Sequence, residues 1–345
     1  MLRVEELTPG GAAEWDAFVT AQATSEHYHL ALWRGVGERA YGLRAPYLLC
    51  RGADGALRGV LPLFIVRRPF GTFMTNGLFG AYGPLLADAE ARAALLARAR
   101  ELAEEARAHH ITLKQLGDDP PPPGYVLRDT SVIATLALAD TADKVWRGFR
   151  DKTRNAVRKA QKQSLSFHED PADLAEFYDV LAENMHRKGT PIYGIAFFRE
   201  LLAALLKDGG GGLAVLRHEG RVVSGGIVAY HRDRVYVPFA SSRPSAFHLN
   251  PNNLLYWELM QRAIARGARV FDFGRSPRDS STLAFKLHFG ATTQPMPFHI
   301  LPLRGAAPAM DSHDPAVQRL VQLWQRLPRQ LADVLGPPIC GRFLI

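Results

Sequence analysis

The spacing of apolar residues along the chain predicts both helices and strands. Apolar positions that recur every three to four residues predict helices, and short apolar runs between turn residues predict strands. The predicted helices cover residues 14–20, 89–109, 142–163, 172–188, 197–207, 252–266 and 314–335, with one more short helix around residue 33. The predicted strands cover residues 47–50, 57–66, 111–116, 131–138, 213–218, 221–230, 234–241, 270–273 and 297–303. This mixture predicts an α/β fold.

Stretches rich in glycine or proline separate these elements. Residues 71–83 combine glycine with aromatic residues and predict an ordered loop, while the glycines at 209–212 predict a flexible one. Four consecutive prolines within residues 118–124 require an extended chain. The last predicted helix, 314–335, is amphipathic, so we expect it to pack on the body of the protein or on a partner.

The same order of elements occurs twice, which indicates a weak internal duplication. In each half a hairpin is followed by a later helix, by a strand directly after that helix, and by a final strand. The corresponding segments are 56–64 and 221–230, 89–109 and 252–266, and 111–116 and 270–273. A repeated unit of about 140 to 160 residues fits ordinary domain sizes. We therefore expect an N-terminal domain at 1–140, a C-terminal domain at 141–305 and a helical extension at 306–345.

Composition narrows the class of protein. The 345 residues are 47% hydrophobic and 22% charged, as in globular proteins, and no run of about 18 apolar residues predicts a membrane-spanning helix. Acidic residues near the N-terminus argue against a signal peptide, and two distant cysteines argue against a disulfide framework. We expect a cytoplasmic protein. The net charge of +8 favours polyanionic partners, such as tRNA, phosphorylated lipids or the inner face of the membrane, but we expect no DNA partner.

The most informative stretch begins at the strand predicted for residues 270–273. Arg275 and Ser276 follow directly, and Lys286 lies ten residues further on in a segment rich in aromatic residues. Ligands of open α/β sheets collect beyond the carboxyl ends of strands. A cation at that point suits an anionic substrate or a developing oxyanion. The alternative interpretation is a strand, a turn and a surface lysine.

Three other segments hold candidate substrate-binding residues. Arg154 and Arg158 lie four residues apart in a strongly basic helix, and the repulsion between such cations indicates a bound anion such as phosphate, or else a solvated face. Tyr193 follows a Gly-Thr-Pro helix stop that could form a wall of the substrate site. Asn253 and Trp257 lie on a helix that opens with three Asn residues, where an Asn can act as the N-cap.

Several familiar motifs are missing from the sequence. It contains no Gly-x-x-x-x-Gly-Lys-Ser/Thr loop, no Gly-x-Ser-x-Gly elbow and no His-Glu-x-x-His spacing, so we expect neither a nucleotide triphosphatase nor a zinc site. The usual loop of CoA-binding acetyltransferases, Gln/Arg-x-x-Gly-x-Gly/Ala before a helix, is also absent. Residues 250–253 stand in its expected place.

Taken in order, several motifs resemble those of the FemAB-type transferases. They are Lys-Thr-Arg-Asn-Ala-Val-Arg-Lys-Ala at 152–160, Gly-Thr-Pro at 189–191, Asn-Leu-Leu-Tyr-Trp at 253–257, Asp-Phe-Gly-Arg-Ser at 272–276, and Phe285-Lys286 with Gly290. The similarity covers roughly residues 10–305 and is greatest to the branch associated with exosortase (PEP-CTERM) exopolysaccharide clusters. It implies two tandem GNAT-like domains with mixed sheets.

The resemblance also implies a reaction, the transfer of an acyl or aminoacyl group to an amine. Fem relatives take an aminoacyl group from tRNA and give it to a peptidoglycan precursor. In them a Phe-Lys pair helps to stabilise the tetrahedral oxyanion, and Phe285-Lys286 matches that pair. The remaining substrate-binding candidates are Arg275, Ser276, Arg154, Arg158, Tyr193, Asn253 and Trp257. Asp272 is the nearest candidate general base.

Donor and acceptor remain open at this point. The chain has no room for the helical arm of some Fem proteins, and it continues past residue 305 into its own helix. The donor is therefore an aminoacyl-tRNA, an acyl carrier protein or a CoA thioester, used as a cosubstrate with no tightly bound cofactor. The acceptor is a cell-envelope or polysaccharide precursor. A third hypothesis is a non-catalytic module that binds nucleic acid or membrane.

Overall fold

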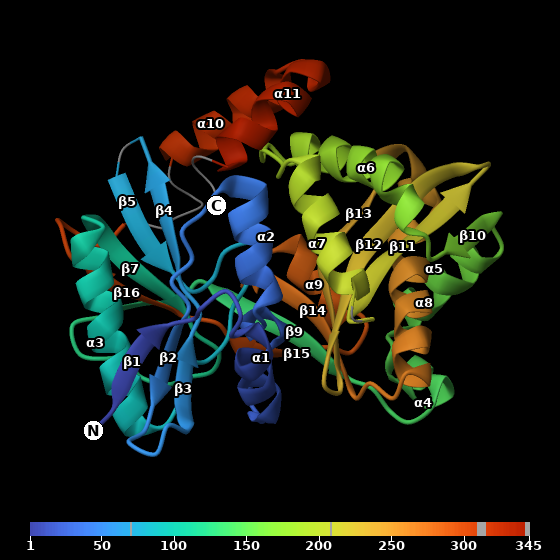
Figure 1. Ribbon diagram of the computed structural model, residues 1–345. Helices are drawn as coiled ribbons and strands as arrows, with labels where there is room; N and C mark the ends of the chain where they lie inside the picture. Colours follow the sequence, from blue (N-terminus) through green and yellow to red (C-terminus); the bar gives the residue numbers. More distant parts are fainter. Residues whose placement is uncertain (70, 208, 309–314, 342–345) are drawn as a thin grey trace. The chain divides into compact units, whose positions relative to one another are not determined.

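The computed structural model describes residues 1–69, 71–207, 209–308 and 315–341. The chain forms two compact units (Figure 1). Over the described residues, unit 1 consists of residues 1–132 and 294–308, and unit 2 of residues 133–293 and 315–341. The division into domains at residues 140 and 305 remains a prediction.

Unit 1 contains two sheets. The first has the strand order β1 (Arg3–Glu6), β2 (Leu48–Arg51), β3 (Leu57–Leu61), β6 (Leu86–Ala87). The second has the order β4 (Phe64–Arg68), β5 (Gly71–Thr75), β7 (Ala108–Lys114), β16 (Phe298–Pro302), β8 (Val126–Arg128). Its helices are α1 (Ala12–Ala21), α2 (Leu32–Tyr41) and α3 (Ala89–Glu105), with a 3-10 turn at His27–His29. The apolar side of α3 is buried in the core of this unit, where Leu95 and Leu102 pack with Met74 and Ile111.

Unit 2 is built on one seven-stranded sheet. The strand order is β10 (Leu165–His168), β11 (Gly211–His218), β12 (Arg221–His231), β13 (Arg234–Ser242), β14 (Val270–Pro277), β9 (Ser131–Ala137), β15 (Thr292–Pro295). The helices are α4 (Ala142–Gly148), α5 (Asp151–Gln161), α6 (Leu174–Arg187), α7 (Ile195–Lys207), α8 (Pro251–Ala265), α9 (Ser281–Leu287), α10 (Pro315–Arg326) and α11 (Arg329–Ile339). Two 3-10 turns occur at Pro171–Asp173 and Pro244–Leu249.

The two units share a connection of the same kind. In unit 1, α3 links β5 to β7, and these strands pair in parallel. In unit 2, α8 links β13 to β14, which also pair in parallel. The correspondence that we expected between residues 89–109 and 252–266 therefore agrees with the strand pairing.

Proline breaks two elements that we expected to be continuous. The apolar run 57–66 forms two strands in different sheets, β3 and β4, with Pro62 between them. The first residue of the predicted helix 314–335 lies outside the described residues, and the described part forms α10 and α11, with Pro328 as the N-cap of the second. Proline has no backbone N–H to donate to a helix or sheet ladder, so the regular structure ends there.

Other differences concern strands and one helix. Part of the expected loops at 71–83 and 209–212 is strand, namely β5 and the start of β11. The helix expected at 142–163 is broken at Phe149 and Arg150, which are extended. Strand β14 runs to Pro277, so Arg275 and Ser276 lie within the strand and not past its end. The final strand, which we expected in the C-terminal domain, is β16, and it pairs with β7 and β8 of unit 1.

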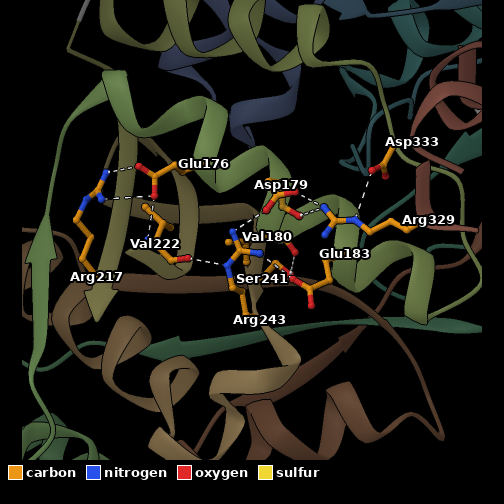
Figure 2. A network of polar contacts seen from close by, with 10 residues as sticks. All are labelled: Glu176, Asp179, Val180, Glu183, Arg217, Val222, Ser241, Arg243, Arg329 and Asp333. Carbon is orange, nitrogen blue, oxygen red and sulfur yellow. Dashed lines mark hydrogen bonds and ion pairs between the residues drawn. The ribbon is translucent and has the colours of Figure 1, made fainter. Parts of the chain in front are cut away.

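The helix pair α10–α11 packs on α6 within unit 2. Nε2 of Gln325 donates to the carbonyl of Arg187 at 2.8 Å, and Nε2 of His186 lies 3.0 Å from the carbonyl oxygen of Leu327. Arg329 forms ion pairs with Asp179 and Asp333 (Figure 2). The bonds of Gln325 and His186 and the Arg329–Asp179 pair bind the helix pair to α6.

Candidate active site

Strands β13 and β14 diverge at the centre of the unit 2 sheet. Over the described residues their parallel ladder comprises three pairs, which end with Tyr236 opposite Asp272. Beyond this point β13 stays paired with β12 up to Ser242, while β14 continues to Pro277. A divergence at the carboxyl ends of parallel strands is the place where α/β sheets bind ligands. Of the candidate residues on β14, Asp272 is the last paired one, and Arg275 and Ser276 lie on the diverging part.

Asp272 stabilises the backbone at the divergence. Its side chain is completely buried, and Oδ1 accepts a hydrogen bond of 2.6 Å from the N–H of Gly274. Oδ2 lies 4.0 Å from Nη1 of Arg234. A buried carboxylate needs such partners because loss of hydration is costly. Gly274 has a φ of +75°, a conformation that glycine adopts without steric strain, and β14 changes direction there.

Lys286 extends from α9 to this turn. Nζ donates to the carbonyl of Gly274 at 2.8 Å and to that of Arg275 at 3.1 Å, and the residue is only 4% exposed. Burial lowers the pKa of this amine from 10.5 to about 8; the charge of Asp272 opposes the shift, and those of Arg275 and Lys188 add to it. A protonated lysine has three N–H donors. Two are used within the part of the chain that the structure describes, which leaves one.

Three further side chains interact electrostatically with Lys286 or with Arg275 beside it. Lys188 ends α6, and its charge is close enough to affect Lys286. Tyr193 follows on the same α6–α7 loop and interacts electrostatically with Arg275. The ring centroid of Tyr193 lies 5.0 Å from that of Phe197 and 6.1 Å from that of Phe239 on β13. Burial lowers the pKa of Arg275, yet solvent reaches this residue, so the guanidinium stays charged.

Ser276 is also part of β14. It is fully buried, and its hydroxyl has no hydrogen-bond partner within the part of the chain that the structure describes. An unsatisfied buried hydroxyl costs on the order of 1–3 kcal/mol. The role of Ser276 in binding substrate remains a prediction.

The junction of α4 and α5 supports α9. The hydroxyl of Thr153 donates to the carbonyl of His288 at 2.8 Å, and the N–H of Arg150 donates to the same oxygen at 3.2 Å. Phe149 packs edge-on against Phe289 with ring centroids 5.1 Å apart. These contacts join two segments that are far apart in sequence and fix the helix that carries Lys286.

The basic helix α5 makes mainly internal contacts through its two candidate arginines. Arg154 donates to the carbonyls of Phe149, at 2.7 Å, and of Arg147, at 3.1 Å, and forms an ion pair with Asp151. Arg158 lies 5.5 Å from the ring centre of Trp146. Arg154 therefore caps the end of α4, and its proposed contact with a bound anion remains a prediction.

The other candidate residues form aromatic packing or begin α8. Trp257 is 7% exposed and packs on Trp146 at 5.1 Å between ring centroids. Phe285 is half-buried and packs on Tyr256 at 5.6 Å. The N–H of Asn253 donates to the carbonyl of the N-cap residue of α8. That residue, the first of the Asn run, makes no side-chain capping bond, contrary to our expectation of an Asn cap.

A cavity of about 840 Å³ lies apart from Lys286, between α6 and the β13–α8 connection. Arg243 in its wall is paired with Asp179 and Glu183, as Figure 2 shows. These two acids neutralise the charge of Arg243. The cavity is therefore a weak candidate for binding a polyanion. We place the candidate active site at Lys286, where an amine with a donor to spare is buried.

Comparison with known proteins agrees with this architecture. Residues 147–286 match the acetyltransferase (GNAT) domain family, and the match ends at Lys286. In structure the chain is similar to a tandem GNAT protein from the clavulanic acid biosynthesis pathway, with 13% identity over 89% of this chain and 100% of that chain, and a TM-score of 0.59. The fold is a tandem GNAT-like fold. This confirms the predicted fold class.

Two other structures show the same fold. FemX is 17% identical over 94% of this chain and 100% of its own, with a TM-score of 0.68. The C-terminal domain of a putative lysylphosphatidylglycerol synthetase from Agrobacterium fabrum is 12% identical over 97% of this chain and 98% of its own, with a TM-score of 0.57. No curated protein matches the chain in sequence. The GNAT domain match supports an acyltransferase.

Lys188 is the site residue that the sequence did not single out. It ends a basic run, His-Arg-Lys, directly before the Gly-Thr-Pro helix stop. That run was visible, but nothing in the sequence indicates that the α6–α7 loop lies near β14. The contact depends on the packing of α6 against the sheet.

Proposed function

We propose that this protein transfers an acyl or aminoacyl group from an activated ester or thioester to an amine. The observation that carries the proposal is the buried Lys286 amine, held by two carbonyl oxygens where β13 and β14 diverge. The GNAT family match supports acyl transfer, and the similarity to FemX supports a FemAB-like protein. The exosortase-associated branch of that group remains our prediction from the motifs.

The reaction needs no covalent intermediate on the protein. The neutral amine nitrogen of the acceptor forms a bond to the donor carbonyl carbon, and the carbonyl oxygen becomes negatively charged. The C–O or C–S bond of the donor then breaks, and a proton of the attacking amine passes to the leaving oxygen or sulfur. Esters and thioesters are already activated, so positioning and stabilisation of the oxyanion supply most of the catalysis. We assign the remaining N–H of Lys286 to that oxyanion.

Asp272 supports this role through its charge. Its carboxylate is buried and bound to the N–H of Gly274, and it raises the pKa of Lys286 against the effect of burial. It thereby favours the protonated amine, which is the form that can stabilise an anion. We propose this electrostatic role in place of the general base that we first considered.

The cations around Lys286 provide a site for an anionic substrate group. We propose that Arg275, Lys188 and Tyr193 bind a phosphate or carboxylate, and that Ser276 supplies a further hydrogen bond. Arg158 is the member of the basic helix that we assign to a larger anion, since Arg154 is engaged at the end of α4. Phe285, Asn253 and Trp257 shape the site by holding α9 and α8 in place.

The neighbours in structure guide the choice of substrates. FemX and the lysylphosphatidylglycerol synthetase favour an aminoacyl donor, such as aminoacyl-tRNA, and a cell-envelope acceptor. An exopolysaccharide-related amine is the acceptor that the motifs suggest. The second candidate is an N-acyltransferase that uses an acyl carrier protein or CoA thioester, which the acetyltransferase family match favours.

The test is a donor panel with the full chain. Aminoacyl-tRNA, acyl carrier protein and acyl-CoA are each supplied in labelled form, and transfer to an amine acceptor is measured. Lys286→Ala should lower the turnover number on the order of a hundredfold or more. Lys144→Ala is the matched control, because Lys144 is exposed and pairs only with Asp140 among the described residues. Near-normal turnover of Lys286→Ala would refute the role that we assign to Lys286. No transfer by the wild type from any of the three donors would leave the non-catalytic binding module as the better hypothesis.

A further inference from the structure

Exposed apolar side chains concentrate on the C-terminal helix pair. Six of them lie on these two helices, and we call them together the hairpin face: Val317, Leu320, Leu323, Leu331, Val334 and Leu335. Val334 is 71% exposed and Leu320 67%. In all the rest of the described chain only five large apolar residues are exposed, and one of them is Met1. Apolar side chains gathered in this way mark an interaction surface.

Packing within unit 2 does not account for the hairpin face. The buried side of α11 is formed by Ala332 and Gly336, and Trp324 of α10 lies against Gly336. Val321 of α10 lies against the loop at Gly189. The helix pair thus has one apolar side that meets the protein and a second that meets solvent. An amphipathic helix that served only the fold would be polar on the second side.

Charge shows what the hairpin face fits. Arg319 and Arg326 are seven residues apart on α10, so they project on the same side of the helix, beside Leu323. Both are exposed, and neither has an ion-pair partner among the described residues. The sequence of α10 contains no Asp or Glu. Apolar residues bordered by arginine are typical of helices that lie in the interface of an anionic bilayer.

We propose that the hairpin face docks on the surface of a bilayer that contains anionic lipid. Leucine and valine enter the boundary of the acyl chains, while the arginines reach lipid phosphates. A second copy of the chain fits less well, since its α10 would bring the same arginines and no acid. None of the described helices is long and apolar enough to cross a bilayer, so the contact is peripheral.

Docking would also place the candidate site near the lipid surface. The helix pair is hydrogen-bonded to the end of α6 through Gln325 and His186, and α6 ends at the loop that carries Lys188 and Tyr193. If the proposed transfer reaction is correct, this favours an acceptor amine held at the membrane. The docking itself does not depend on that reaction.

The test is cosedimentation of the full chain with vesicles. Vesicles of phosphatidylcholine with phosphatidylglycerol are compared with vesicles of phosphatidylcholine alone. The double variant Leu320→Ser, Leu323→Ser should bind the anionic vesicles about tenfold or more weakly. Leu206→Ser is the matched control, since Leu206 is 44% exposed on α7 and lies off the hairpin face. Thermal melting of each variant checks that it is folded.

The arginines provide an independent variant. Arg319→Gln with Arg326→Gln should weaken binding to the anionic vesicles at low salt and have little effect at high salt. Equal binding of wild type and the double leucine variant, or no binding to anionic vesicles at all, overturns the proposal. So does a dimer in sedimentation velocity that the leucine substitutions dissociate without any lipid binding. Binding is measured without turnover, so a failed acyl-transfer assay leaves this result intact.

Discussion

Replacing Lys286 with methionine should change how the stability of the protein depends on pH. In the folded protein burial lowers the pKa of this amine from 10.5 to about 8. Between these two values the unfolded chain binds more protons than the folded one, so stability rises as the pH increases. Below pH 8 both states are protonated, and the full cost of the buried charge remains. Methionine has a similar length and no charge, so the Lys286→Met variant lacks the cost of burying the charge.

The expected size follows from the two pKa values. With 10.5 in the unfolded state and about 8 in the folded state, the cost of the charged lysine is about 3 kcal/mol at pH 7 and about 1.5 kcal/mol at pH 9.5. Between pH 7 and pH 9.5, the free energy of unfolding of the wild type should therefore rise by about 2 kcal/mol relative to that of the variant. The hydrogen bonds to Gly274 and Arg275 affect the size of the difference in free energy of unfolding between wild type and variant, but they change its pH dependence little.

The assay is urea denaturation of both proteins at pH 7 and pH 9.5. Taking the difference between the proteins at each pH removes the contribution of other titrating groups. Lys144→Met serves as the control for replacing a lysine at the surface, since the Lys144 side chain is 60% exposed. A difference between wild type and Lys286→Met that stays constant within about 0.5 kcal/mol would refute the buried, charged lysine.

Three further results are expected. In a pH–rate profile, acyl transfer should decline above pH 8 as Lys286 loses its proton, and Lys286→Arg should shift that decline to higher pH. Thr153→Val should lower the free energy of unfolding, measured by urea denaturation, by about 1 kcal/mol and should also lower turnover, because the bond to the end of α9 is lost. Thr153→Ser keeps the hydroxyl, so its stability and turnover should be those of the wild type. Gly189→Ala should speed limited proteolysis within 315–341, because its φ is +73° and a Cβ there overlaps Val321. An unchanged cleavage rate would show that α10 does not rest on this loop.

Much of unit 2 follows from local sequence. The helical spacing at 252–266 and the apolar runs at 213–218, 221–230 and 234–241 predict α8, β11, β12 and β13 within a few residues. These signals are local because one face of each element must be apolar to be buried. The candidate residues Asp272, Arg275 and Lys286 were also visible, as polar residues that follow a buried run.

Only the tertiary structure decided how these residues act together. The end of the helix at Phe149 and Arg150 depends on His288, whose carbonyl accepts from Arg150 and Thr153 across more than 130 residues. No local pattern can show such a bond. The same holds for Lys188, whose charge affects Lys286 only because α6 packs on the sheet. The sequence by itself determined which side chains could carry chemistry; burial and long-range hydrogen bonds decided that Lys286 is held with a donor to spare.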